Sequence, residues 1–393
     1  MVRQHEEVAV QAGRRSTGPD ATPQRRAIRT WLAAALLGAS AAAAACPICL
    51  GAGQHTVAQE LAAAQQAVLA IPTAEAGRFR VVEVIRGERP SARAIEAGYP
   101  RFAPALPAPV SKGEALLIAR EDPLLGWVVL GSIGIDQASW LRKLAVGKHS
   151  EEISTQEWRD RVALVVPRLQ SRQPLVAKIA YGDLAAAPYA ALRTAKPHLD
   201  AGAVRAWLAD PTLASHQRLH LLLLGVAGYA QDAAALEQRL GAARQSGDAT
   251  NLASMLTADL ELRGPTRMAW VEENYLRDRA RSAPEVEAAL LALSVQGHAN
   301  GVIPRERVIQ SYRVYMKAHP DSAGNVAPDL AAWQYWDAVS EYQALMKSGV
   351  RQQYPSMVAM QSYLLQSADA RASGSSAQAS RSSGPAPAAL RSP

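Results

Sequence analysis

The spacing of hydrophobic residues divides the chain into a strand-rich part and a longer helical part. Short apolar runs predict four β-strands, at residues 67–71, 79–85, 115–119 and 127–130. A loop and a short helix are expected before them, at 50–65. The intervening segment 90–109 is rich in proline and is therefore expected to be a loop. Four short strands so close together predict a small antiparallel sheet or barrel.

From about residue 150 the hydrophobic period becomes helical and stays so. Trp158, Val162 and Val165 fall on one face of a helix that opens with a capping box, Ser154 and Glu157. The same device, Ser282 with Glu285, opens a later helix, and Gly297 is expected to cap its C-terminus.

About eleven helical segments of about 10 to 20 residues are expected between 154 and 367. One segment, 221–227 (LLLLGVA), is apolar all round and is placed at the centre of the helical part. Consecutive short helices bury their apolar faces against their neighbours. The predicted fold class is therefore α+β and mostly α, with a small antiparallel β module followed by an α-solenoid-like (HEAT-like) array. A compact all-α domain is the alternative to the array.

Four regions are expected: a signal segment (1–45), a small β-rich domain (46–149), a helical-repeat domain (150–366) and a disordered tail (367–393). The signal segment has a basic region with Arg25, Arg26 and Arg29, an apolar stretch 31–45, and small residues at Ala43 and Ala45 for cleavage. A membrane anchor is the alternative, although fifteen residues are short for a bilayer of about 30 Å. We expect an exported protein, periplasmic or extracellular. The tail is rich in Ser, Ala, Gly and Pro and has little to bury.

Cleavage after Ala45 would leave Cys46 at the N-terminus, and Cys46 and Cys49 (Cys-Pro-Ile-Cys) are the only two cysteines. In an oxidising compartment this pair can form a disulfide that fastens the new N-terminus. Redox or metal chemistry and lipid attachment at Cys46 are the alternatives. Lipid attachment is the one route by which we expect membrane association.

Composition and charge favour a folded protein without a nucleic-acid partner. Hydrophobic residues make up 49% of the chain and charged residues 20%, and the net charge is +7. Beyond the signal segment there is no run of Lys and Arg of the kind that follows phosphates.

Other candidate chemistry is sparse. His216 and His220 have the spacing of a metalloprotease helix, but Gln217 stands where its general base would be, so both are expected on a polar face. Paired acids such as Glu272 and Glu273 are expected at the surface. We find no motif for a catalytic site, a cofactor or a metal. Three aromatics in four residues cannot all face one core in a helix, so a possible interaction surface is predicted at three residues: Trp333, Tyr335 and Trp336.

Several segments carry a resemblance: the Cys-Pro-x-Cys start, FRVVEVIRG (79–87), PLVAKIAYGDL (174–184), APY (187–189) and WLADP (207–211). In layout the chain resembles a group of exported bacterial proteins with HEAT-like helical repeats, which implies a helical-repeat body and assigns no activity. The strand-rich part is similar to the netrin-like module of tissue inhibitors of metalloproteinases. That second resemblance implies that the amine of an N-terminal Cys46 could meet a protease zinc.

The function expected from these observations is non-catalytic binding or scaffolding in the cell envelope, with a protein partner there. Helical arrays present long surfaces, and no reactive constellation competes with that role. Two alternatives remain open. One is a thiol–disulfide oxidoreductase that uses Cys46 and Cys49, and the other is a protease inhibitor that acts through Cys46.

Overall fold

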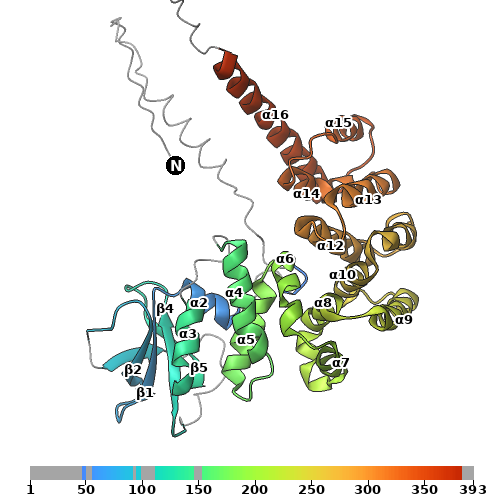
Figure 1. Cartoon of the computed structure of the whole chain (residues 1–393). Coiled ribbons are helices and arrows are strands. Elements are labelled where there is room, and N and C mark those ends of the chain that lie inside the picture. Colours follow the sequence, from blue (N-terminus) through green and yellow to red (C-terminus); the bar gives the residue numbers. More distant parts are fainter. Residues whose placement is uncertain (1–46, 50–54, 92–93, 99–110, 146–152, 383–393) are drawn as a thin grey trace, which may run out of the picture. The chain divides into compact units, whose positions relative to one another are not determined.

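The structure, a computed structural model, describes residues 47–49, 55–91, 94–98, 111–145 and 153–382, with side chains up to residue 373 (Figure 1). It confirms the predicted fold class: the chain is α+β and mostly α, with a small β module followed by helices. Within the described part, no helix is both long and apolar enough to cross a membrane.

Five strands form a closed barrel in the order β1-β2-β3-β5-β4. Their bounds are β1 (Gln66–Pro72), β2 (Arg78–Arg86), β3 (Ala94–Gly98), β4 (Glu114–Arg120) and β5 (Trp127–Gly134). The four predicted strands are confirmed, whereas β3 lies in the segment that was expected to be a loop. Ile95 and Ala97 are buried on either side of the exposed Glu96, and β3 joins β2 to β5. Its pairing with β5 is parallel, so the module is not purely antiparallel.

Strands β1 and β4 are buried on both faces, which explains why their sequences are almost continuously apolar. Val68 and Ala70 of β1 belong to the core inside the barrel, together with Leu116 and Ile118 of β4. The alternate residues of the same strands point outward and join the core of the helical part. One continuous core thus extends from the outer wall of the barrel into the helices.

The helices follow in chain order: α2 (Val57–Ala63) precedes the barrel, and after it come α3 (Ala138–Ala145), α4 (Thr155–Val165), α5 (Pro174–Ala186), α6 (Tyr189–Leu192), α7 (Ala201–Ala209), α8 (Gln217–Ala227), α9 (Ala230–Ser246), α10 (Leu252–Arg263), α11 (Met268–Val271), α12 (Ala283–Ala299), α13 (Arg305–Ala318), α14 (Ala327–Ala332), α15 (Val339–Lys347) and α16 (Tyr354–Ser382). Several are shorter than the expected 10 to 20 residues. Contacts run mainly between neighbours along the chain, for example α7 with α8, α10 with α12, and α12 with α13.

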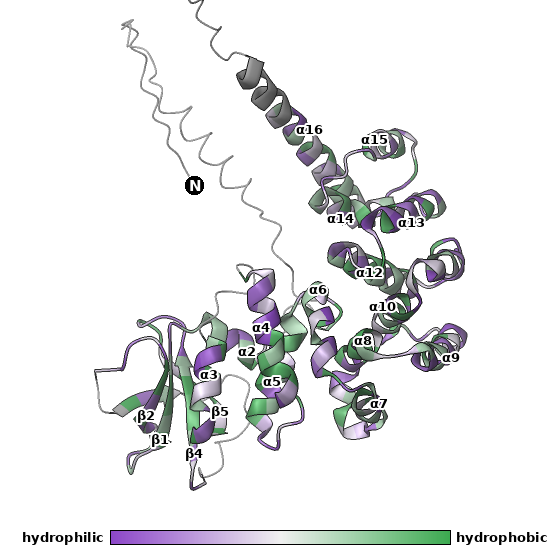
Figure 2. Ribbon diagram, viewed as in Figure 1, coloured by the Kyte–Doolittle hydropathy of each residue, from purple (hydrophilic) through white to green (hydrophobic). Residues whose placement is uncertain are grey.

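Helix α8 lies at the centre of these contacts, as its sequence predicted. All its residues from Leu219 to Ala227 are buried, and it packs against α7 and α10. Figure 2 shows the contrast between the largely hydrophobic α5 and the largely hydrophilic α4, which has only one apolar stripe.

Helix α5 fastens the helical part to the barrel. It contacts α2 and β5, and the Gln173 side chain before it accepts a hydrogen bond from the backbone N–H of Gly134 at 2.9 Å. Gly131 of β5 has a φ of 149°, and a Cβ there would lie 3.2 Å from a methyl of Leu175. A glycine at this position therefore permits both the backbone conformation and the close approach of α5.

Both predicted capping boxes form. The Ser154 hydroxyl accepts a hydrogen bond from the Glu157 N–H, and the Glu285 carboxylate accepts one from the Ser282 N–H. The expected C-cap at Gly297 is wrong, because α12 continues to Ala299 and Asn300 takes the left-handed conformation instead. Gly297 has a packing role: a Cβ there would lie 2.5 Å from the Trp333 ring.

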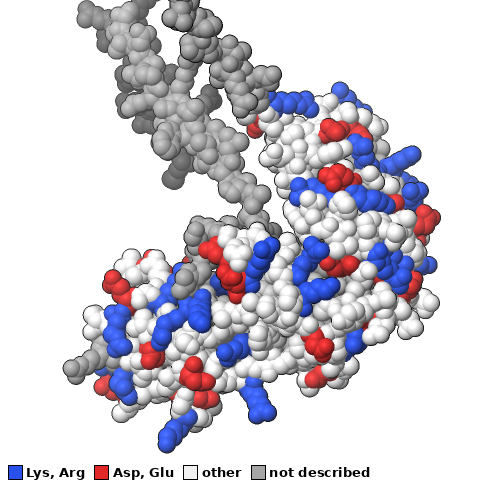
Figure 3. All heavy atoms as spheres, viewed as in Figure 1, with Lys and Arg blue, Asp and Glu red and all other residues white. Residues whose placement is uncertain are grey.

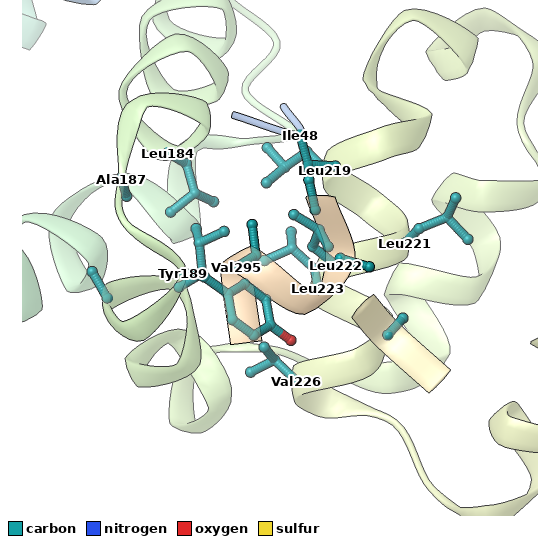
Figure 4. Packing of buried hydrophobic residues seen from close by; sticks show 14 of the residues in the cluster. Ile48, Leu184, Ala187, Tyr189, Leu219, Leu221, Leu222, Leu223, Val226 and Val295 are labelled. Atoms are coloured by element: carbon teal, nitrogen blue, oxygen red, sulfur yellow. The ribbon is translucent and has the colours of Figure 1, made fainter. Parts of the chain in front are cut away.

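The turn Pro47–Cys49 precedes the β module in the sequence but packs on helices. Ile48 is buried in the core formed by α5, α6 and α8, and Figure 4 shows it in a cluster with Leu184, Leu219 and Leu222. The start of the expected mature chain therefore contributes to the helical core and not to the barrel interior.

The last helix extends into the segment that was expected to be disordered. Helix α16 continues to Ser382, and Ser367, where the tail was predicted to begin, is buried. Alanine favours the helix, which outweighs the scarcity of large apolar residues here. Residues 383–393 lie outside the described part.

We expect Ile48→Ala to lower the free energy of unfolding by about 2–4 kcal/mol, because it removes a fully packed side chain from the helical core. Urea denaturation followed by circular dichroism measures the change. Pro47→Ala, at the exposed neighbouring residue, is the control. Equal effects of the two substitutions would contradict the packing of Ile48.

Candidate functional site

The predicted cysteine pair is described only in part. Cys46 lies outside the described residues. Cys49 is half-buried and packs against the helical core at the end of the turn that Ile48 anchors. Whether the pair is structural, redox-active or lipidated stays a prediction.

The three predicted surface aromatics are all partly buried against the core. The Trp333 ring stacks on Tyr312 with ring centroids 5.7 Å apart, and the Trp336 ring lies 5.2 Å from that of Tyr363. The Tyr335 hydroxyl accepts a hydrogen bond from Arg313 at 2.6 Å. These contacts show that the aromatics connect α13, α14 and α16, and a role in partner binding stays a prediction.

A turn explains how these neighbouring aromatics can all pack inward. Helix α14 ends at Ala332, and Gln334 takes a φ of 55°. If all three residues lay on one helix, their side chains would have to diverge. The turn at Gln334 redirects the chain and removes that restriction.

A cluster of aromatic and histidine side chains links α5, α7 and α8, with the ring of Trp207 from α7 5.5 Å from that of His220. The Tyr181 hydroxyl lies 2.8 Å from Nε2 of His220, and the Gln170 amide donates to the same hydroxyl at 2.6 Å. The His216 ring stacks on Tyr181 with centroids 3.8 Å apart. Because the Tyr181 oxygen already accepts from Gln170, its proton is available for Nε2 of a neutral His220. His220 is fully buried, so its expected place on a polar face is wrong.

Burial sets the protonation states of this cluster. Burial, together with the smaller effect of the nearby His216, lowers the pKa of His220 to about 4. It also lowers the pKa of His216 and raises the pKa of Tyr181 to about 12. Near neutral pH the cluster is therefore uncharged and held together by hydrogen bonds and ring packing.

A cavity of about 800 Å³ lies where the barrel meets the first helices. Its walls come from α2, α4, α5 and the end of the barrel formed by β4 and β5. Apolar side chains supply much of the lining, including Leu125, Val128 and Trp158. This volume falls within the range of small-molecule pockets.

Two buried charges, Arg161 of α4 and Asp183 of α5, form part of the cavity wall. Nε of Arg161 lies 2.7 and 2.8 Å from the two carboxylate oxygens of Asp183, and Nη1 donates to the Leu144 carbonyl at 3.1 Å. Burial raises the pKa of Asp183, and the adjacent Arg161 guanidinium opposes that rise. The pair thus connects α3, α4 and α5 and neutralises itself.

Similar arginine–carboxylate pairs join other helices. Three examples are Arg205 with Asp232, Arg267 with Asp259, and Arg307 with Glu272. Glu272 is buried and also accepts a hydrogen bond from the Ser311 hydroxyl, so its expected place at the surface is wrong. At the surface, basic and acidic side chains are interspersed on the face shown in Figure 3.

The residues of the cavity and of the Tyr181 cluster were missed as a group by the sequence argument. One signal was present: Asp183 and His220 each interrupt an apolar run in a helix that is buried on nearly all sides. A polar residue in such a run requires a partner. The sequence does not identify that partner, because Arg161 and Tyr181 are 22 and 39 residues away.

Comparisons of the chain with protein-family models, curated proteins and solved structures found no match. Among the described residues, no three His, Cys, Asp or Glu side chains converge in a group that could hold a metal ion.

We expect Arg161→Met to lower the free energy of unfolding by about 3–5 kcal/mol, because it leaves the Asp183 carboxylate buried without its partner. Adding Asp183→Leu to Arg161→Met should recover most of the lost free energy of unfolding. Urea denaturation of both variants measures this, with Arg78→Met, in an exposed ion pair, as the control that changes little. Failure of the double variant to recover would contradict a self-neutralising pair.

Acidification should destabilise the protein through His220. Its pKa is about 4 when folded and about 6.5 when unfolded, so the unfolded state takes up the proton first. Neutral His220 contributes about 2–3 kcal/mol to the free energy of unfolding. This contribution is complete above pH 6.5 and is lost as the pH falls toward 4. Unfolding free energies measured between pH 7.5 and 4.5 should therefore fall less in His220→Leu than in the wild type. The matched control is His198→Leu, at an exposed histidine, and equal slopes in the two variants would refute the assignment.

Proposed function

We propose that the chain is a non-catalytic binding or scaffolding protein of the cell envelope that docks a protein partner on its last helices. The observation that carries the proposal is a row of exposed apolar residues on α16. Tyr354 and Leu365 are 73% and 69% exposed, and Val358 between them is also exposed. Val358 and Leu365 follow Tyr354 by four and eleven residues, which puts all three on one face of the helix.

Neighbouring residues support the same surface. Met346 of α15 and Val350 in the following turn are also exposed, whereas most large apolar residues of the helical part are buried. Exposed apolar residues grouped on one element are typical of interaction surfaces. The end of a stacked helical array normally needs a polar outer face, so an apolar one favours a partner.

The envelope location rests on the signal-like segment of the sequence, which lies outside the described residues. The oxidoreductase and inhibitor alternatives both require Cys46, which also lies outside them. The partner surface on α16 depends on neither cysteine, and it can be tested separately.

Photo-crosslinking in cells that express the full chain tests the proposal. p-Benzoylphenylalanine at Tyr354 should give a discrete protein adduct in the envelope fraction. Placed at Tyr229, the 66% exposed residue that precedes α9, it should not. Val358→Ser together with Leu365→Ser should reduce the Tyr354 adduct several-fold without changing the urea midpoint. No adduct at Tyr354, or equal adducts at both positions, would refute this surface.

A further inference from the structure

We propose that the cavity between the barrel and the first helices binds a small, uncharged, largely apolar organic molecule, such as an ester with a hydrocarbon chain. This site is separate from the partner surface on α16 and does not depend on it. Its evidence is the composition of the walls, the ion pair of Arg161 with Asp183 within them and the apolar rim.

The walls favour an apolar ligand. Leu130, Ile153 and Trp158 line the cavity together with alanines of α2. Binding there would remove hydrocarbon from water, which is favourable. Aromatic and aliphatic walls with a few polar groups are typical of small-molecule sites.

The charges favour an uncharged ligand. The buried Arg161 and Asp183 neutralise each other. Arg120, also in the lining, donates Nε to the Gln66 side chain at 2.6 Å and lies over the Trp127 ring. Burial raises the pKa of Glu60, since a charged carboxylate is poorly solvated in this wall. A charged ligand would lose its own hydration and would have to compete with these existing contacts.

The rim favours entry of an apolar molecule from solvent. Leu125 and Val128 line the cavity and are also exposed, although large apolar side chains are usually buried. The volume of about 800 Å³ is sufficient for a drug-sized molecule. A ligand seated there would cover part of both exposed side chains.

The probe is N-phenyl-1-naphthylamine, an uncharged dye whose fluorescence rises in apolar surroundings, added to the folded full chain. It should bind saturably with energy transfer from tryptophan. Trp158→Phe should lower that transfer more than Trp333→Phe, which removes a partly buried tryptophan elsewhere. Equal loss in the two variants would place the dye outside the cavity.

Filling the cavity is the second test. Ala63→Trp, in the α2 wall, should weaken dye binding at least tenfold, whereas Ala242→Trp, at an exposed alanine of α9, should not. Circular dichroism checks folding, and Val128→Trp replaces Ala63→Trp if that variant does not fold. Leu124→Ser changes a 93% exposed residue outside the lining and should leave affinity unchanged. If it abolishes binding, the dye binds the exposed loop and the proposal is wrong.

Ligand charge is the third test. Ethyl octanoate should displace the dye at a concentration at least fivefold lower than octanoate, because only octanoate carries a charge into the wall. Tighter binding of octanoate, or no displacement by either compound, would overturn the proposed ligand class. None of these outcomes depends on the α16 surface, so the two proposals can fail separately.

Discussion

The burial of β1 and β4 on both faces is the constraint on which the rest of the structure depends. Their inward residues fill the barrel, and their outward residues belong to the core shared with the helices. Exposing either face to water would remove a large apolar area from the core, which is unfavourable. The barrel and the first helices therefore stabilise each other, and the cavity lies at their junction.

Several polar groups within this apolar framework have specific partners on other helices. Asp183, His220 and Glu272 are buried, and each contacts a side chain from another helix. An unpaired charge or hydrogen-bonding group would be costly in such surroundings. These contacts therefore restrict how the helices can pack, because a shift of one helix would leave a buried polar group without its partner.

The proposed binding surfaces differ in their chemistry and in their relation to the core. The cavity is enclosed by elements that the shared core holds in place, so its shape depends on tertiary packing. The α16 face is a feature of one helix, whose other side is fixed by Met360 and Tyr363. A concave site suits a small ligand, and an exposed helix face suits a protein.

The sequence by itself determined the fold class, four of the five strands, both capping boxes and the buried position of α8. These features depend on local periodicity and on side chains three or four residues apart. Only the tertiary structure decided the place of β3, the packing role of Gly297, the turn at Gln334 and the contact of Ile48 with the helices. It also brought Arg161 to Asp183 and Tyr181 to His220. These depend on residues distant in the chain, and hydrophobic pattern specifies that a side chain is buried without specifying what it contacts.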